Sequence, residues 1–144
     1  MSNGPQIFHF PEGIPGFETH HDFRFIPEEE AVLAHLVSVK EDEVRFILLR
    51  PEIYFPEYLK EIDVDEESIK GLNIIANNPV DVWVILTLNR QEIAKTTVNL
   101  RAPILFNTVE GIGMQVIFND DRYLSSQLLL REKNLQPLQE GVVG

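Results

Sequence analysis

Histidines are the first residues of this sequence whose types and spacing could support metal chemistry. The 144-residue chain holds four of them, and two are adjacent in the run His20-His21-Asp22. Imidazole and carboxylate groups are common zinc ligands. Neighbouring side chains on an extended strand point to opposite faces, so this pair cannot chelate one ion without a special loop. We therefore interpret the histidines as exposed loop residues and expect no metal.

Two acidic runs offer the oxygen ligands that calcium prefers. Their residues are Glu28, Glu29 and Glu30 in the first run and Glu41, Asp42 and Glu43 in the second. Neither run has the ligand spacing of a known calcium loop. Both runs lie beside expected strand ends, where charged turns are common, and we interpret them as solvated turns.

No motif for catalysis or nucleotide binding accompanies these groups. The segment EGIG at 110–113 lacks the length and the Lys of a phosphate-binding loop. No Gly-x-Ser-x-Gly elbow of a serine hydrolase occurs in the chain. An enzyme needs convergent polar groups, and the sequence displays none. We expect a protein that is not an enzyme and that takes no cofactor.

The net charge of −11 is unevenly distributed along the chain. Residues 1–70 hold 16 acidic residues against 6 Lys and Arg, whereas residues 71–144 hold 7 against 6. Such acidity should repel nucleic acids and anionic membranes, so we expect no direct binding to either. Two interpretations stay open: the acidity serves a basic protein partner, or it only maintains solubility.

Length and composition indicate one globular domain spanning residues 1–144. A chain of this length can bury a core without disulfides, and it contains no cysteine. No apolar run approaches the ~20 residues that span a bilayer, and the N-terminus lacks a secretory pattern. We therefore expect a cytoplasmic protein.

Short strands dominate the pattern along the chain. The expected strands cover 7–10, 23–26, 31–39, 44–49, 80–88, 96–100, 103–107 and 114–119. The segment 80–88 is the clearest, because Val80, Val82 and Val84 alternate with other residues on a wholly apolar face. Short, regularly spaced strands predict a mainly β, compact antiparallel barrel-like or sandwich domain with one or two short helices.

Helical signals are confined to two short segments before residue 72. Pro56 can begin a helix at 56–62, and Asp65 can cap a second one that Gly71 would end. Residues 121–139 could be a helix with Leu124, Leu128 and Leu135 on one face, or could begin as a strand. Residues 136–144 are expected to form a flexible tail.

Two aromatic segments have unusual backbone chemistry. FPEGIPGFE at 10–18 combines a Pro15-Gly16 turn with a second break at Pro11 and Gly13, and its flanking phenylalanines can anchor this corner on a core. RPEIYFPEY at 50–58 presents three aromatic residues between prolines. Those aromatics can be core anchors for a chain crossing or a rigid protein-binding surface.

Several segments together resemble the family of flagellar assembly factors FliW. They are FPEGIPGFE at 10–18, LVSVKEDEVRFILLRPEIYFPEY at 36–58, VWVILTL at 82–88, TTVNLRAPILFN at 96–107 and MQVIFNDDRY at 114–123. The similarity covers nearly the whole chain in order. The Ile-Pro-Gly-Phe turn and the Asn-Leu-x-Ala-Pro-Ile segment are its most specific marks.

The resemblance implies a barrel-like, cytoplasmic, non-catalytic protein with two protein partners. Members of the family bind newly made flagellin and the translational regulator CsrA, a small basic RNA-binding dimer. Flagellin that accumulates occupies FliW and frees CsrA to repress flagellin translation. The acidity of the chain fits a partner that is basic because it binds RNA.

From this resemblance and the patterns above, we expect two binding surfaces. The flagellin-binding residues would be Ile53, Tyr54, Phe55, Pro56, Tyr58, Asn99, Leu100, Ala102, Pro103 and Ile104. The regulator-binding residues would be the two acidic runs, Glu28, Glu29, Glu30, Glu41, Asp42 and Glu43. A different function class, a β-barrel that binds a small molecule, is the alternative. The chain departs from the family pattern at 107–115, which lacks Lys and Arg, and at 124–130, which is apolar.

Overall fold

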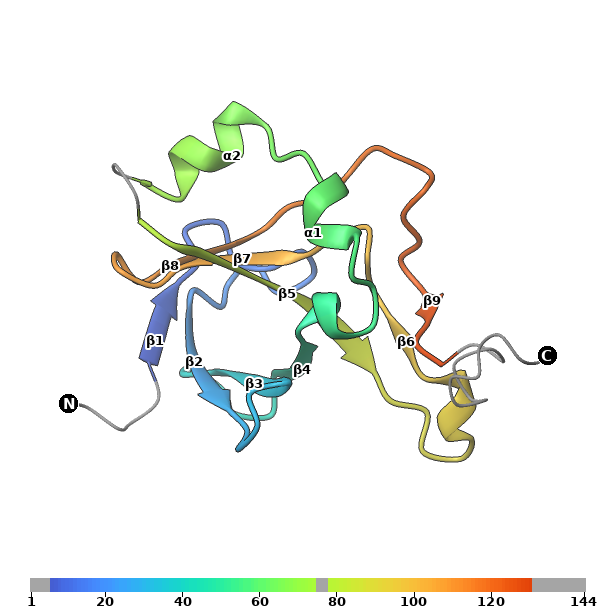
Figure 1. The fold of residues 1–144 in the computed structure, drawn as a ribbon. Coiled ribbons are helices and arrows are strands. Elements are labelled where there is room, and N and C mark those ends of the chain that lie inside the picture. Colours follow the sequence, from blue (N-terminus) through green and yellow to red (C-terminus); the bar gives the residue numbers. More distant parts are fainter. Residues whose placement is uncertain (1–5, 75–77, 131–144) are drawn as a thin grey trace.

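A computed structural model describes residues 6–74 and 78–130 of the chain, which form nine strands and four short helices in that part (Figure 1). The strands are β1 (Gln6–His9), β2 (Asp22–Pro27), β3 (Leu33–Ser38), β4 (Arg45–Leu49), β5 (Val80–Thr87), β6 (Thr97–Val98), β7 (Ile104–Asn107), β8 (Ile112–Gln115) and β9 (Gln127–Leu128). The helices are η1 (Pro51–Ile53), α1 (Tyr58–Glu61), α2 (Glu66–Gly71) and η2 (Ile93–Lys95). The expectation of a mainly β domain is confirmed.

Seven of the strands close into a barrel. The hydrogen-bonded order runs β4-β3-β2-β1-β8-β7-β5, and β5 pairs back with β4 through Ile47 opposite Leu86. All neighbours are antiparallel except β1 and β8, which are parallel and meet only at His9 and Ile112. Strands β6 and β9 extend the sheet beyond β5. The structure thus selects the barrel over the sandwich.

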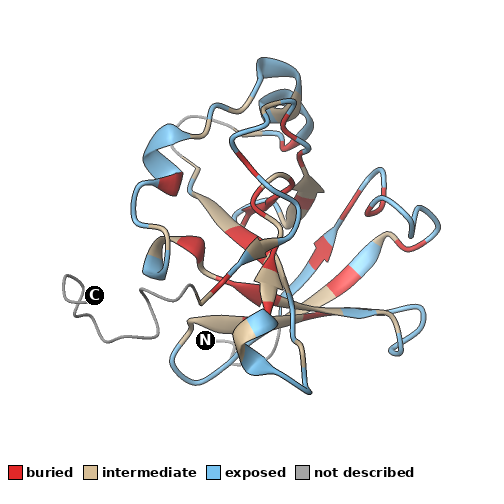
Figure 2. Cartoon of the chain, turned by 90° about the vertical axis from the view of Figure 1, so that its right-hand side faces the viewer, coloured by how far each residue is buried: buried red, intermediate tan, exposed pale blue. Residues whose placement is uncertain are grey.

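Alternate residues of the barrel strands face two different cores, and segments outside the barrel strands supply most of the outer one. The inner core lines the barrel with Phe8, Phe10, Ile14, Phe23, Ala34, Leu36, Leu48, Trp83, Ile104 and Phe106. The outer core covers the outside of β5 and β7 with Leu49, Tyr58, Leu72, Val84, Val98, Leu100, Leu105, Val116, Phe118, Tyr123 and Leu129. In Figure 2 the buried residues lie both on the strands and on irregular segments, and exposed residues cover most of the turns and short helices.

The corner at residues 10–18 forms as its sequence predicts. Gly16 has a φ of +90°, which the second central position of a type II turn requires, and Phe17 N donates to Ile14 O at 2.6 Å. Phe10 is fully buried and anchors the corner, whereas Phe17 is 36% exposed. Ile14 enters the inner core and helps to close one end of the barrel.

Of the four described helices, only α2 has a side-chain cap. Helix α1 begins at Tyr58, two residues after the Pro56 start that the sequence predicts. Asp65 caps α2, because its side chain accepts from Ser68 N at 3.3 Å. Gly71 does not end the helix in a left-handed conformation as predicted; it is the last helical residue, and Asn73 takes the positive φ of 57°. A Cβ at Gly71 would meet the Met114 methyl group, which can move because it is the end of a flexible side chain. None of the helices in the described residues is long and apolar enough to cross a membrane.

Two expected segments differ from the structure near the C-terminus. Strand β8 begins at Ile112, two residues earlier than expected, and its regular part ends at Gln115. Residues 121–130 are not helical, and Gln127 and Leu128 instead pair with β6 as β9. The rest of the uncertain segment and the expected tail at 136–144 lie outside the described residues.

Candidate protein-binding surfaces

The connection from β4 to β5 carries the first predicted apolar segment. Proline at the start of η1 presets the backbone, and Phe55 N donates to Pro51 O at 2.7 Å. Tyr58 N then donates to Phe55 O at 2.9 Å and leads into α1. Consecutive turns therefore hold the segment in a compact shape over the outside of the barrel.

An exposed apolar ledge results on this connection. It consists of Ile53, Tyr54, Phe55, Pro56 and Leu59, and we use the name ledge for these residues. Ile53 is 55% exposed, and Tyr54 and Leu59 are each 38% exposed. Phe55 is half-buried against the outer core. Sequence reasoning missed Leu59, because only the burial of Tyr58 turns the next residue outward.

The second predicted segment, 99–104, lies beneath the surface. Leu100, Ala102 and Ile104 are 7%, 6% and 0% exposed, and Pro103 is buried. Asn99 is half-buried, and its side-chain oxygen accepts from Arg101 N and Ala102 N at 3.1 and 3.0 Å. Fully buried side chains cannot contact a partner in this conformation. Their direct role is to support the fold under the surface.

A single hydrogen bond joins the two predicted segments. The Tyr58 hydroxyl donates to Leu100 O at 2.6 Å, although the two residues are 42 positions apart. Tyr58 is 3% exposed and meets Tyr123 edge to face at 5.6 Å. Burial raises the pKa of Tyr58 far above its ordinary value, so the hydroxyl stays a neutral donor. Leu100 N in turn donates to Leu124 O, which ties the next segment to this point.

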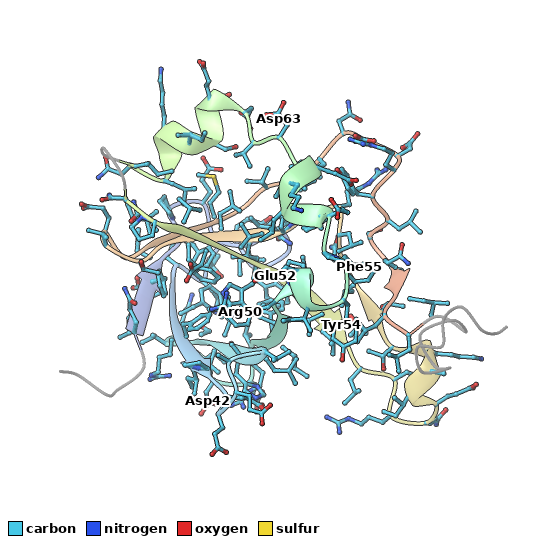
Figure 3. The ribbon with its side chains drawn as sticks, in the orientation of Figure 1. Asp42, Arg50, Glu52, Tyr54, Phe55 and Asp63 are labelled. Carbon is cyan, nitrogen blue, oxygen red and sulfur yellow. The ribbon has the colours of Figure 1, made fainter. Side chains whose placement is uncertain are left out.

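The two acidic runs lie at opposite ends of the same strand. Residues 28–30 belong to the turn from β2 to β3, and residues 41–43 belong to the turn from β3 to β4. Strand β3 has six residues, so the turns are separated by about 20 Å. All six acids are exposed. In Figure 3 Asp42 lies at the bottom of the molecule, apart from Tyr54 and Phe55 on the β4–β5 connection.

One acid of the first run has a partner within the chain. Glu28 Oε2 lies 2.6 Å from His35 Nε2. The other five acids form no side-chain hydrogen bond or ion pair with the described residues. The first run therefore presents two unengaged carboxylates, and the second run presents three.

The histidines differ in part from their interpretation as exposed loop residues. His20 is only 7% exposed, and its Nδ1 lies 2.8 Å from Ser38 Oγ. A hydroxyl partner lets the imidazole ring be buried without leaving that nitrogen unsatisfied. His9 and His35 lie in the strands β1 and β3, so the interpretation is wrong for these three histidines. His21 Nδ1 lies 2.9 Å from Phe10 O. Among the described residues, no group of three or more His, Asp or Glu side chains is placed to hold a metal ion.

Aromatic side chains pack against one another in the barrel interior. Phe106 meets Phe8 and Phe25 edge to face at 4.7 and 5.2 Å, and Phe25 meets Trp83 at 5.2 Å. Side chains fill small barrels in this way, whereas ligand-binding barrels keep a cavity. A cavity of about 270 Å³ remains beside these rings, and its lining includes Phe8, Phe25, Trp83 and Phe106. The alternative of a small-molecule-binding barrel therefore stays a hypothesis.

Known proteins share this architecture and sequence pattern. The family model described as FliW protein matches residues 2–129. The flagellar assembly factor FliW of Bacillus pumilus is 40% identical over 125 residues, which cover 86% of this chain and 85% of the relative. The protein of the same description from Anoxybacillus flavithermus is 36% identical over 123 residues, 85% and 83% of the two chains.

A solved structure is similar over the same length. The crystal structure of the flagellar assembly factor FliW superposes with a TM-score of 0.79 at 36% sequence identity. The superposition covers 89% of this chain and 88% of that chain. Fold and sequence are thus both similar over most of the chain.

Proposed function

This chain belongs to the FliW family of flagellar assembly factors, and we propose that it binds flagellin and antagonises the translational regulator CsrA. It acts in the cytoplasm and catalyses no reaction. Flagellin that accumulates occupies the protein and releases CsrA, so that the level of flagellin controls its own translation. Membership in the family supports this proposal, and the placement of apolar and acidic surfaces supports its two halves.

The ledge is the observation that carries the flagellin half of the proposal. Apolar side chains with 38% to 55% of their surface exposed stand on a connection that is hydrogen-bonded turn by turn. A rigid apolar surface loses little conformational entropy on binding and suits the apolar face of a partner helix. The direct contacts are Ile53, Tyr54, Phe55 and Pro56.

The buried residues among the predicted flagellin contacts act indirectly, by supporting the exposed surface. Tyr58 bonds to Leu100 O, and Leu100 packs in the outer core under the connection. Ala102, Pro103 and Ile104 are buried in the following segment. Substituting these buried residues tests the stability of the segments that support the ledge. Substituting the exposed residues of the ledge tests the contact with flagellin itself.

Paired surface variants test the flagellin contact. The double variant Ile53→Ser/Tyr54→Ser should lose more than ~1 kcal/mol of affinity for purified flagellin, measured by calorimetry, because apolar anchors at a contact are worth at least this much. The matched control is Ile93→Ser. Ile93 is also 55% exposed and also lies in a 3-10 helix, but outside the ledge.

The control variant should bind flagellin within about twofold of the wild type. Circular dichroism must show that both variants keep the β signal of the parent. Equal flagellin affinity of the folded double variant and the wild type would remove the ledge from the proposal.

The acidic turns carry the regulator half of the proposal. Because they lie at opposite ends of β3, we propose that both raise the rate of encounter with a basic regulator and that only one of them lies in the final contact. Long-range attraction of this kind weakens as salt screens the charges. Residues 41–43 are the stronger candidate for the contact, because Glu28 in the other run is already engaged with His35.

Neutralising the runs separately tests this arrangement. One variant carries Glu28→Gln, Glu29→Gln and Glu30→Gln, and the other carries Glu41→Gln, Asp42→Asn and Glu43→Gln. Both should slow association with CsrA at low salt, and the second should also speed dissociation. Flagellin affinity should stay within roughly twofold, because exposed single charges contribute little to an apolar contact. Association rates that ignore both salt and these substitutions would reduce the acidic turns to solvated surface.

A further inference from the structure

A groove lies on the side of the molecule where α2 faces β8. Its volume is about 530 Å³. Three segments line it: the corner at residues 11–18, the helix α2 with its cap Asp65, and residues 113–117 of β8 and its continuation. In Figure 1 α2 lies above β8 at the upper left of the molecule. The ledge and the acidic turns do not contribute to it.

One wall of this groove is an open strand edge. Val116 N donates to Pro103 O and Phe118 N donates to Arg101 O, which continue the ladder between β7 and β8. Backbone N–H groups of an antiparallel strand alternate between its two edges. Those of Gln115 and Ile117 therefore point to the other edge, where β8 pairs with a described strand only at Ile112.

Strand β1 leaves this edge uncovered because its direction changes. His9 N donates to Gly111 O at 2.8 Å, and this is the end of the parallel pairing. Pro11 has no N–H to continue a ladder. Gly13 N donates to Phe10 O at 2.9 Å and has a φ of +70°, so the chain turns away from β8 at this point. The place beside residues 113–117 is the one that a longer β1 would occupy.

The groove is acidic on both sides of the open edge. Glu12 and Glu18 stand on the corner, Asp65 and Glu67 stand on or before α2, and no Lys, Arg or His lines the groove. Glu18 is engaged with Gly16 N and Asp65 with Ser68. Glu12 and Glu67 have no ion pair or side-chain hydrogen bond among the described residues. Negative charge thus faces any chain that enters.

Backbone pairing and charge together point to one kind of occupant. We propose that an extended, Lys- or Arg-containing segment of a protein partner adds to the free edge of β8 as a further strand. Its backbone pairs with Gln115 and Ile117, and its basic side chains reach Glu12 and Glu67. About five residues of an extended chain span this edge. Strand addition of this type gives affinity through main-chain hydrogen bonds and selectivity through side chains.

Synthetic peptides test the proposal on the whole protein. The probe is an acetylated and amidated peptide of alternating Lys and Val, eight residues long. A matched peptide carries N-methyl groups on alternate residues, which remove the N–H groups of one edge and leave the charge unchanged. The unmethylated peptide should bind at least about tenfold more tightly, because several backbone hydrogen bonds are lost in the other. Amide resonances of residues 113–117 should shift on binding.

Two double variants separate charge from strand pairing. Glu12→Gln/Glu67→Gln should weaken the Lys-Val peptide about threefold to tenfold at low salt, since two unengaged acids are removed. The control is Glu66→Gln/Glu110→Gln, which removes the same charge at exposed positions that do not line the groove. It should stay within about twofold.

Two results would overturn the inference. Equal affinity of the methylated and unmethylated peptides would show that no strand is added. Peptide-induced shifts confined to residues 28–30 or 41–43 would place basic peptides on the acidic turns. The inference does not depend on the proposed function, because neither flagellin nor CsrA takes part in this experiment.

Discussion

Residues that alternate along the same strands build two different interiors. At the adjacent positions Trp83 and Val84 of β5, the first side chain enters the inner core and the second enters the outer core. The same alternation separates Phe106 from Leu105 on β7. The inner core is a network of edge-to-face rings enclosed by the barrel. The outer core is mostly aliphatic and is covered by irregular segments.

This difference assigns separate tasks to the two cores. Closure gives each of the seven strands a neighbour on both sides, although β8 is paired with β1 only at Ile112, and the closed sheet makes a stiff frame around the inner core. The outer core supports the two surfaces proposed to bind partners, the ledge and the groove. Phe55 of the ledge packs against this core, and so does Met114 beside the groove. Buried polar bonds such as Tyr58 to Leu100 hold those irregular pieces in place. We expect damage to the inner core to lower overall stability and damage to the outer core to alter the surfaces first.

The largest effect is expected from Phe106→Ala in the inner core. Phe106 is 1% exposed and contacts Phe8, Phe10 and Phe25 through its ring. The variant should lose about 3–5 kcal/mol of unfolding free energy in urea, because it leaves a cavity between rings. Both cores share their strands, so Trp83 fluorescence and far-UV circular dichroism of the wild type should report one transition. Two separate transitions would show that the cores unfold independently.

A smaller effect is expected from Tyr58→Phe in the outer core. The variant removes the donor to Leu100 O and leaves that buried carbonyl unpaired, which costs about 1–3 kcal/mol. Tyr123→Phe is the matched control, because the buried Tyr123 hydroxyl has no hydrogen-bond partner among residues 6–74 and 78–130. The control should change stability by less than about 0.5 kcal/mol or increase it. Equal losses in both variants would show that ring packing, and not the hydrogen bond, holds the two segments together.

Still smaller is the stability change expected on the ledge itself. Ile53→Ser/Tyr54→Ser should alter the unfolding free energy by about 0.5 kcal/mol or less per site, since both side chains are substantially exposed. The same variant should lose flagellin affinity, so stability and binding separate at this position. A large loss of stability would make the ledge part of the outer core and would exclude it as a surface.

The smallest effect is expected for the pH dependence of stability at the corner formed by residues 10–18. Hydrogen bonding from Gly16 N, the largest cause, lowers the pKa of Glu18 from 4.5. A carboxylate with a lowered folded pKa adds stability above the unfolded pKa, and this stability is lost as pH falls through the folded value. Glu18→Gln should therefore show a smaller decrease of the thermal midpoint between pH 6 and pH 3 than the wild type. Glu12→Gln, in the same corner but without such a hydrogen bond, should follow the wild type.

Local patterns were enough to predict the features that depend on neighbouring residues. The Pro15-Gly16 turn forms because proline and glycine fix the two central dihedral angles. Asp65 caps α2 because its carboxylate lies within reach of Ser68 N three residues later. The strands at the start of the chain also lie where alternation and β-branched residues predict them.

The sequence by itself determined a mainly β domain, its corner and the capped helix, because those features follow from dihedral preferences and contacts only a few residues apart. Only the tertiary structure decided that the wholly apolar face of β5 packs outward and that Trp83 points into the barrel. It also placed the acidic runs at opposite ends of β3, buried Leu100 and residues 102–104, and left an edge of β8 open. These outcomes depend on barrel closure and on pairs such as Tyr58 and Leu100, 42 positions apart. Periodicity shows that a strand has two faces, but strand pairing decides what each face meets.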